Sequence, residues 1–409
     1  MGYQQGLSGL AGASSDLDVI GNNIANANTV GFKQGQAQFA DVYANSMATA
    51  LNNQIGIGTR LAEVQQQFSQ GTITTTNQAL NVAINGNGFY QLSDNGTMVY
   101  SRNGVFHLDE TGKIVNSAGL QLMGFAADSN GIINSASTVP LSVPTANIAP
   151  VATKGVTLAF NLNSQDSVIG KAFDPNDSTT YNTSTSIDTF DSLGGTQKVS
   201  VYFIKTATGS WDAYAGYGDP VTVVPPAAAG GKIGTVTFDS SGNMTGTGKF
   251  NFSIPNGADG GATNQAMTVD FSGTTQYGAK SGVTAANQDG NTTGELTGFT
   301  VGPDGVLMGN YSNMDTKPLG QIALANFANQ NGLQNLGGNV YAQTAASGAP
   351  QVSVPGATNH GTLQGGAVEN SNVDLTAELV NLITAQRNYQ ANAQTIKTQQ
   401  TVDQTLINL

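Results

Sequence analysis

The sequence has no cysteine, few charged residues and no long apolar run, and each absence excludes a class of protein. Without cysteine the chain forms no disulfide, thiolate metal site or cysteine nucleophile. Charged residues make up only 10% of the 409 residues, and the formal net charge is −12. Such an acidic chain is a poor partner for nucleic acid or an anionic membrane. The apolar runs are far too short for membrane insertion.

Sequence signals for catalysis are equally scarce. His107 and His360 are the only histidines, and they do not stand in a metal-ligand spacing. The segment 85–91, NGNGFYQ, has Gln91 where a dinucleotide-binding loop needs its third glycine, so it predicts a tight turn. No aspartate-rich turn has the distal glutamate of a calcium loop, and no local pattern nominates a pair of catalytic carboxylates. We therefore expect no enzyme activity, no metal and no cofactor.

Glycine, in contrast, is abundant. The chain has 52 glycines beside many Asn, Thr and Ser residues, which predicts many turns and short strands. Apolar residues alternate with small or polar ones in three segments, which predicts half-buried strands at residues 156–162, 199–203 and 267–271. Turn signals predict hairpins in antiparallel sheets at residues 94–96, 109–112, 128–131, 239–242 and 303–305.

A seven-residue apolar spacing predicts one helix at each end of the chain. The N-terminal stripe is Tyr3, Leu10, Leu17 and Ile24, filled in by Leu7 and Ile20. The C-terminal stripe is Leu375, Leu382, Tyr389 and Ile396, with Leu379 between. Ser371 and Asp374 resemble a capping box, which predicts that the second helix begins near Asn372.

Prolines 140, 144 and 150 and the polar stretch 274–291 predict the boundaries of an inserted domain. The expected fold class is multidomain α+β, with a discontinuous terminal α-helical coiled-coil domain and nested, mainly antiparallel β domains in the middle. The expected division is a terminal helical domain at 1–32 plus 367–409, a connecting arm at 33–71, an inner β domain at 72–145 plus 291–366, and an inserted outer β domain at 146–290. We expect the glycine-rich connections near 140–150 and 274–291 to let the outer β domain shift.

The two predicted helices carry uncharged amides where lysine and glutamate normally solvate a helix. The N-terminal helix has Asn22, Asn23, Asn26 and Asn28, although asparagine is a poor interior helix former. Amides both donate and accept hydrogen bonds, so they pack against copies of themselves without bringing like charges together. We therefore expect these asparagines and the two apolar stripes to form an assembly interface, with the ends becoming ordered on assembly. The plain alternative is that the stripes are ordinary core faces.

These residues also carry a family resemblance. Residues 16–42, DLDVIGNNIANANTVGFKQGQAQFADV, closely resemble the N-terminal signature of the bacterial flagellar rod and hook protein family. Residues 86–125, beginning GNGFYQLSDNG, resemble the shared sheet segment of that family, and residues 320–350 and 368–406 resemble its C-terminal part. The length, the large insert and residues 294–327, beginning GELTGFTVGPDG, are similar to hook subunits, because rod subunits mostly lack so large an insert.

The resemblance implies a structural subunit that assembles helically into the flagellar hook, a curved universal joint that transmits torque from rod to filament. It implies export by the flagellar type III apparatus to an extracellular location, which agrees with the lack of a cleavable signal pattern in residues 1–18. The implied partners are copies of the chain itself, the distal rod protein, the hook cap protein and the hook-filament junction protein. The alternatives are a distal rod subunit and, from another class, a β-rich surface adhesin or binding module with helical stalks.

Overall fold

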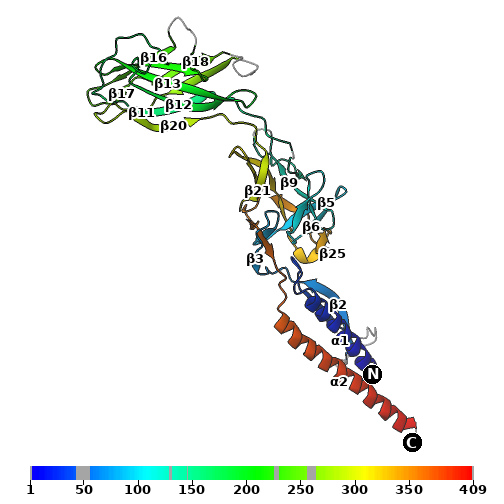
Figure 1. The fold of residues 1–409 in the computed structure, drawn as a ribbon. Helices are drawn as coiled ribbons and strands as arrows, with labels where there is room; N and C mark the ends of the chain where they lie inside the picture. Colours follow the sequence, from blue (N-terminus) through cyan, green and yellow to red (C-terminus); the bar gives the residue numbers. More distant parts are fainter. Residues whose placement is uncertain are drawn as a thin grey trace. The chain divides into compact units, whose positions relative to one another are not determined.

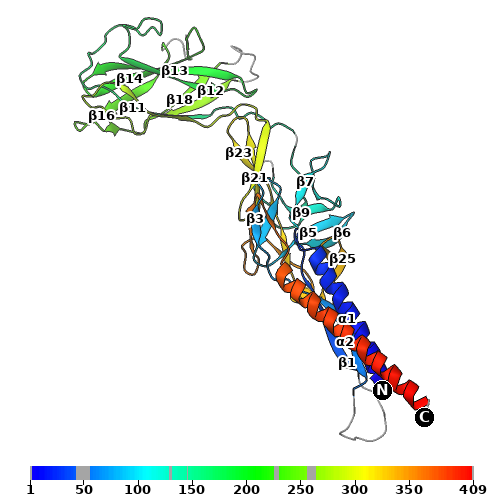
Figure 2. The ribbon, with the colours of Figure 1, turned by 60° about the horizontal axis from the view of Figure 1, so that its bottom comes forward.

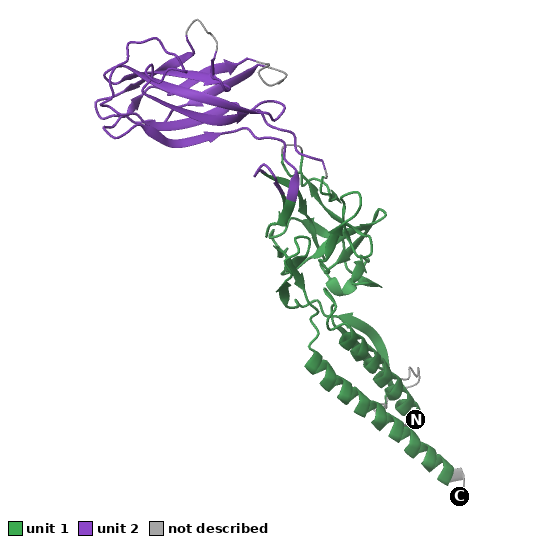
Figure 3. Cartoon of the chain, in the orientation of Figure 1, with its two compact units in different colours: residues 1–145, 298–309, 316–409 green, residues 146–297, 310–315 purple. Residues whose placement is uncertain are grey.

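The structure, a computed structural model, describes residues 2–42, 56–128, 131–144, 146–224, 230–255 and 264–407. The chain forms two compact units (Figure 3). We call residues 1–145, 298–309 and 316–409 the helix-bearing unit, and residues 146–297 and 310–315 the sandwich unit. The expected α+β class, with a helix at each end and mainly antiparallel sheets between, is confirmed.

Two antiparallel helices form one end of the helix-bearing unit. Helix α1 (Gly2–Ala25) lies beside α2 (Leu375–Ile407) in both views of the ribbon (Figures 1 and 2). A Cβ atom at Gly6 would lie 3.0 Å from Ile396 Cγ1, and one at Gly9 would lie 2.7 Å from Asn392 Oδ1. The two helices therefore approach closely at these glycines. Within the described residues, no helix is both long and apolar enough to cross a membrane.

Helix α2 begins three residues later than the sequence predicts, so the capping-box expectation is wrong. The carboxylate Oδ1 of Asp374 accepts hydrogen bonds from the backbone N–H groups of Thr376 at 2.8 Å and Ala377 at 3.2 Å. Asp374 is therefore the N-cap residue, and the first turn follows it. The Ser371 hydroxyl accepts only the N–H of Val373, before the helix.

A two-stranded antiparallel ribbon packs along α1. It consists of β1 (Gly35–Val42) and β2 (Gly58–Gln66). The Gln5 amide donates to the carbonyl of Gly56 at 2.7 Å, and several residues of β2 contact α1. The described part of the predicted connecting arm is thus this ribbon, whereas residues 43–55 of that arm lie outside the described residues.

The largest sheet holds thirteen strands of the described chain. Its main path, in hydrogen-bonded order, is β21 (Leu296–Val301), β22 (Val306–Tyr311), β23 (Thr316–Ile322), β9 (Gln121–Ala126), β5 (Phe89–Asp94), β6 (Thr97–Ser101), β26 (Val340–Ala342) and β25 (Gln334–Gly337). Off this path are β7 (Phe106–Leu108), β8 (Ile114–Asn116), β10 (Val139–Pro140), β24 (Leu324–Asn326) and β27 (Gln351–Ser353). A short 3₁₀ helix, η2, spans Gln330–Gly332. In the core beside the thirteen-stranded sheet, aromatic rings pack edge to face; they belong to Phe89, Tyr100, Phe327 and Tyr341.

Two short strand pairs bring the two ends of the chain together. Strand β3 (Ile73–Thr75) pairs with β29 (Ala367–Glu369), and β4 (Val82–Asn85) pairs with β28 (Thr362–Gly365). The segment after β4 makes the predicted tight turn, with Gly86 at φ +109° and Gly88 at φ +127°. The predicted hairpin turns at 94–96, 109–112, 239–242 and 303–305 are also confirmed, whereas 128–131 lies partly outside the described residues.

The sandwich unit contains two sheets that share one apolar core. One sheet has the order β12 (Thr183–Phe190), β13 (Thr196–Ala207), β14 (Ser210–Tyr217), β16 (Lys232–Phe238) and β17 (Met244–Thr245), with β15 (Thr222–Val223) beside β14. The other has the order β18 (Lys249–Ile254), β19 (Gln265–Asp270), β11 (Gly155–Asn161) and β20 (Gly282–Gln288). Every apolar residue that the alternation at 156–162, 199–203 and 267–271 assigned to the core is buried there, so those three strands are confirmed.

The polar stretch 274–291 is not the flexible connection that the sequence predicts. Its residues 282–288 form β20, which pairs antiparallel with β11 over residues 156–161. The side chains of β20 are exposed apart from the half-buried Gln288, so no apolar alternation marks this edge strand. The expectation that this stretch acts as a hinge is therefore wrong.

Candidate assembly interface

The structure leaves most of α2 uncovered. Of residues 375–405, whose side chains are described, only Glu378 and Ala385 are buried. The C-terminal stripe divides accordingly: Leu375, Leu379 and Tyr389 are exposed, whereas Leu382 and Ile396 are half-buried. On α1, Tyr3 and Leu7 are exposed, and Leu10, Leu17 and Ile24 are half-buried.

The side of α2 that faces α1 is mainly polar, and sequence reasoning missed it. Glu378, Ala385 and Asn392 recur every seven residues along this side, and Ile396 contacts α1 at Gly6. The helix contact was predicted from apolar stripes, so a helix face made of carboxylate, amide and small residues was not recognised. The available signal was the run of small residues in α1, which permits close approach of a second helix.

The predicted interface asparagines have three different environments. Asn23 is buried, and its amide donates to the Gly35 carbonyl at 2.8 Å and accepts from the Gly35 N–H at 2.9 Å. Its hydrogen-bonding groups thus hold β1 against α1 within one chain. Asn26 donates to the Asn22 carbonyl and side chain at the end of α1, whereas Asn28 is exposed.

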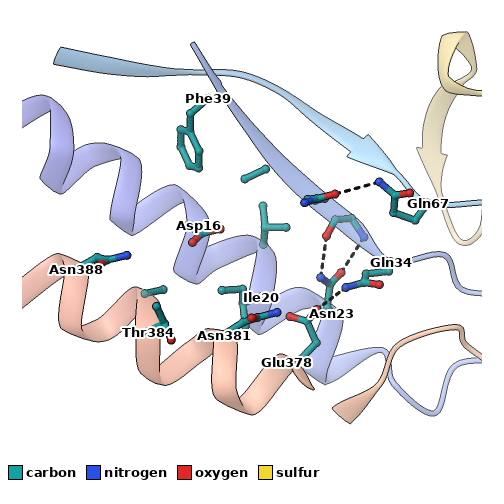
Figure 4. Close-up of a pocket in the computed structure, with 15 residues that line it drawn as sticks. Asp16, Ile20, Asn23, Gln34, Phe39, Gln67, Glu378, Asn381, Thr384 and Asn388 are labelled. Atoms are coloured by element: carbon teal, nitrogen blue, oxygen red, sulfur yellow. Dashed lines mark hydrogen bonds between the residues drawn. The ribbon is translucent and has the colours of Figure 1, made fainter. Parts of the chain in front are cut away.

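A cavity of about 410 Å³, the helix pocket, lies between α1, α2 and the ribbon (Figure 4). Its lining residues are Asp16, Val19, Ile20, Asn23, Gln34, Gly35, Gln36, Ala37, Phe39, Gln67, Glu378, Asn381, Thr384, Ala385 and Asn388. Glu378 is 2% exposed; its Oε1 accepts a short hydrogen bond from the Gln34 amide, and its Oε2 has no partner among the described residues. Burial raises the pKa of Asp16 on the α1 wall above its ordinary value.

Three buried charges, the junction cluster, connect the helices to the β strands. Glu369 Oε1 accepts hydrogen bonds from Lys33 Nζ at 2.7 Å and from the Gly71 N–H at 2.9 Å. Glu369 Oε2 accepts from Arg102 Nε at 3.0 Å and lies 2.9 Å from Arg102 Nη2. The side chains of Lys33 and Glu369 are fully buried, and that of Arg102 is 5% exposed.

Each member of the junction cluster comes from a different part of the chain. Lys33 follows α1, Arg102 follows β6, and Glu369 ends β29 before α2. Arg102 also donates to the carbonyls of Gly86 and Gly88, and Lys33 donates to the carbonyl of Ser69. Burial, together with the nearby Arg102 cation, lowers the pKa of Lys33 despite its carboxylate partner. The cluster thus fixes the segments through which the helices join the β domain.

The described residues offer no evident metal site. No group of three or more metal-ligating side chains gathers in the described ranges. The ring of His360 contacts the backbone oxygens of Ala357 and Gln351, and His107 is exposed on β7.

Comparison with known families identifies the whole chain. Four family profiles match: "Flagella basal body rod protein" at residues 4–33, "Flagellar hook protein FlgE/F/G D1 domain" at 83–159, "Flagellar basal body protein FlaE D2 domain" at 161–291, and "Flagellar basal body rod FlgEFG protein C-terminal" at 364–409. The chain is 42% identical over 415 residues to the flagellar hook protein FlgE of Salmonella typhimurium strain LT2, with 100% of both chains covered. The chain belongs to the flagellar hook protein family.

Two further relatives agree with this assignment. The hook protein of Escherichia coli K12 is 41% identical over 100% of both chains, and that of Treponema pallidum is 32% identical over 99% of this chain and 98% of its own. The predicted membership of the rod and hook family is therefore confirmed, and the full-length similarity to proteins named for the hook favours a hook over a rod subunit. The chain is a structural subunit of the bacterial flagellar hook.

Proposed function

We propose that this hook subunit polymerises helically through α1 and α2. The observation that carries the proposal is the exposed apolar surface of α2, where Leu379 is 45%, Val380 59% and Ile383 51% exposed. A helix of 33 residues is about 50 Å long, and a helix this polar and this uncovered gains little stability from its own chain. Contacts with further copies would cover the apolar residues and stabilise the helix.

The proposed roles follow the predicted division of the chain. Residues 1–32 with 367–409 form the inner tube, and residues 33–71 contact a neighbouring copy. Residues 72–145 with 291–366 form the inner β domain, residues 146–290 form the outer one, and the connection near 140–150 lets the outer domain shift as the tube bends. The junction cluster supports torque transmission, because it ties the helices to the inner β domain through buried, hydrogen-bonded charges.

The proposal also extends to location and partners. We place the subunit outside the cell, delivered by the flagellar type III apparatus without a cleaved signal peptide. Its ends in the assembly contact the distal rod protein, the hook cap protein and the hook-filament junction protein. These roles agree with the family assignment and require no cofactor.

Electron microscopy and sedimentation of concentrated full-length protein test the proposal. We expect the wild type to form curved tubes, and Leu379→Asp to abolish them, because a carboxylate replaces apolar area that the assembly covers. Leu382→Asp tests the half-buried edge of the same stripe. Thr376→Asp is the control: it adds the same charge at an exposed position in the first turn of α2, where a negative charge is favourable.

Circular dichroism must show that each variant keeps the β structure of the wild type. Polymers from Leu379→Asp at wild-type yield contradict an assembly core made of α1 and α2. Straight tubes from the wild type contradict the bending role, and the absence of any polymer in the presence of the cap protein contradicts helical self-assembly.

A further inference from the structure

The helix pocket presents two carboxylates and no cation. Glu378 on α2 and Asp16 on α1 both line it, and none of its lining residues is a lysine or arginine. Glu378 is almost completely buried, yet its Oε2 has no donor among the described residues. A buried carboxylate oxygen without a hydrogen bond is destabilising. The described part of one chain supplies no donor for this oxygen, so a donor from another molecule would stabilise the pocket.

Unpaired cations lie on the outside of the same helical region. Arg60 on β2 and Arg387 and Lys397 on α2 are exposed, and none has an ion pair or side-chain hydrogen bond within the described residues. Arg387 follows Glu378 by nine residues, which in an α-helix corresponds to a rotation of about 180°. Arg387 is therefore at the level of the pocket along α2 but points away from it.

We infer that the helix pocket binds the guanidinium group of Arg387 from a second copy of this chain. The inference rests on the proposed helical assembly and names one of its contacts. A planar guanidinium carries five donors, which suits a pocket that offers the free oxygen of Glu378 and the carboxylate of Asp16, with the amide side chains of Asn381 and Asn388 in the same lining.

The placement of pocket and cation also explains why such a contact propagates. Each copy offers the pocket on one side of α2 and Arg387 on the other, so it can bind one neighbour through each. A head-to-tail contact of this kind does not close on a pair of copies but continues into a ring or an open helix. Of the three cations, Arg387 reaches a neighbour's pocket with little shift along the helix axis, whereas Lys397 lies ten residues further along α2.

Charge reversal tests the pair in full-length protein. We expect Arg387→Glu to raise the critical concentration for polymerisation at least about tenfold, because it places a third carboxylate at the pocket of the neighbour. Lys397→Glu, an equal charge change at an exposed position of the same helix, is the matched control, and we expect it to change the critical concentration less than about threefold. Equal effects of the two variants, or no effect of Arg387→Glu, overturn the inference.

A mixing experiment shows whether the pair joins two copies. Arg387→Glu and Glu378→Arg should each assemble poorly alone, but an equal mixture should copolymerise, because alternating copies restore one complementary pair at every contact. Asp16→Arg replaces Glu378→Arg if the latter fails to fold by circular dichroism. A mixture that assembles no better than its components overturns the inference while leaving polymerisation of the wild type intact. A wild type that forms no polymer overturns both the proposed function and this contact.

Discussion

The junction cluster predicts that two substitutions at one ion pair have very different costs. The cluster holds two cations, Lys33 and Arg102, around the single carboxylate of Glu369. Glu369→Gln keeps the shape of the side chain but leaves two buried positive charges with no counter-charge. Removing one partner of a buried ion pair costs about 3–5 kcal/mol in the free energy of unfolding, because the remaining charge stays buried.

Lys33→Met removes a charge from the same pair at a much lower cost. Arg102 still neutralises Glu369, and the Gly71 N–H still donates to its Oε1. The Ser69 carbonyl loses Lys33 but keeps the amide of Asn372 at 3.2 Å. The methionine fills the apolar space of the lysine stem, so we expect a loss of at most about 1 kcal/mol.

Urea unfolding distinguishes the two variants, and the chain contains its own control. The single tryptophan, Trp211, is fully buried in the sandwich unit, so its fluorescence follows that unit, whereas far-UV circular dichroism also follows the helix-bearing unit. With a typical urea dependence, Glu369→Gln should lower the circular dichroism midpoint by about 1.5–2.5 M and leave the tryptophan midpoint unchanged. Equal losses for Glu369→Gln and Lys33→Met would refute the charge-balance reasoning.

Three further predictions concern single side chains. Gly21→Ala should stabilise α1 by up to about 1 kcal/mol, since nothing lies within 4 Å of the new Cβ. Gly9→Ala should not give this stabilisation, because its new Cβ would lie 2.7 Å from Asn392 Oδ1. Thermal melts of the two variants compare them directly. Asp374→Ala should cost about 1 kcal/mol and reduce the helical circular dichroism signal, because the α2 cap is lost; an unchanged signal contradicts the assigned cap. Hydrogen bonds from the loop N–H groups lower the pKa of Asp239 below its ordinary value of 3.8. The stabilisation from this carboxylate is therefore present above that pH and is lost as the pH falls through the folded-state pKa. Tryptophan-monitored unfolding at pH 6 and pH 3 should show that Asp239→Asn loses less stability in acid than the wild type.

The parts of the fold that depend on local pattern were predictable from the sequence. The seven-residue spacing located both helices, and alternating apolar residues located β11, β13 and β19. Strand β20 was missed because its side chains are largely exposed, so its position depends on backbone pairing with β11 alone. The parallel pairing of β11 with β19, in a unit whose other strand pairs are antiparallel, was also beyond local pattern, because it depends on which distant strands meet.

The candidate site divides in the same way. The apolar stripes predict an assembly interface on α1 and α2, but a stripe does not show which part of it the partner helix covers. The pocket carboxylate Glu378 and the junction pair of Lys33 with Glu369 depend on contacts between the two ends of the chain. The one sequence signal for these residues was their charge, because charged residues are rare in this chain. It marked them as unusual without naming their partners.

The pairing of the two chain ends also sets the order in which the subunit can fold. Strands β3 and β29 pair position 75 with position 367, and α1 packs on α2, so the helix-bearing unit has a high contact order. Most strands of the sandwich unit pair within residues 155–288. If residues become available from the N-terminus onward, as in synthesis, the sandwich unit can therefore complete itself while α1 still lacks its partner. The paired helices, which form the surface proposed for assembly, are then completed last, because α2 is the final element to become available.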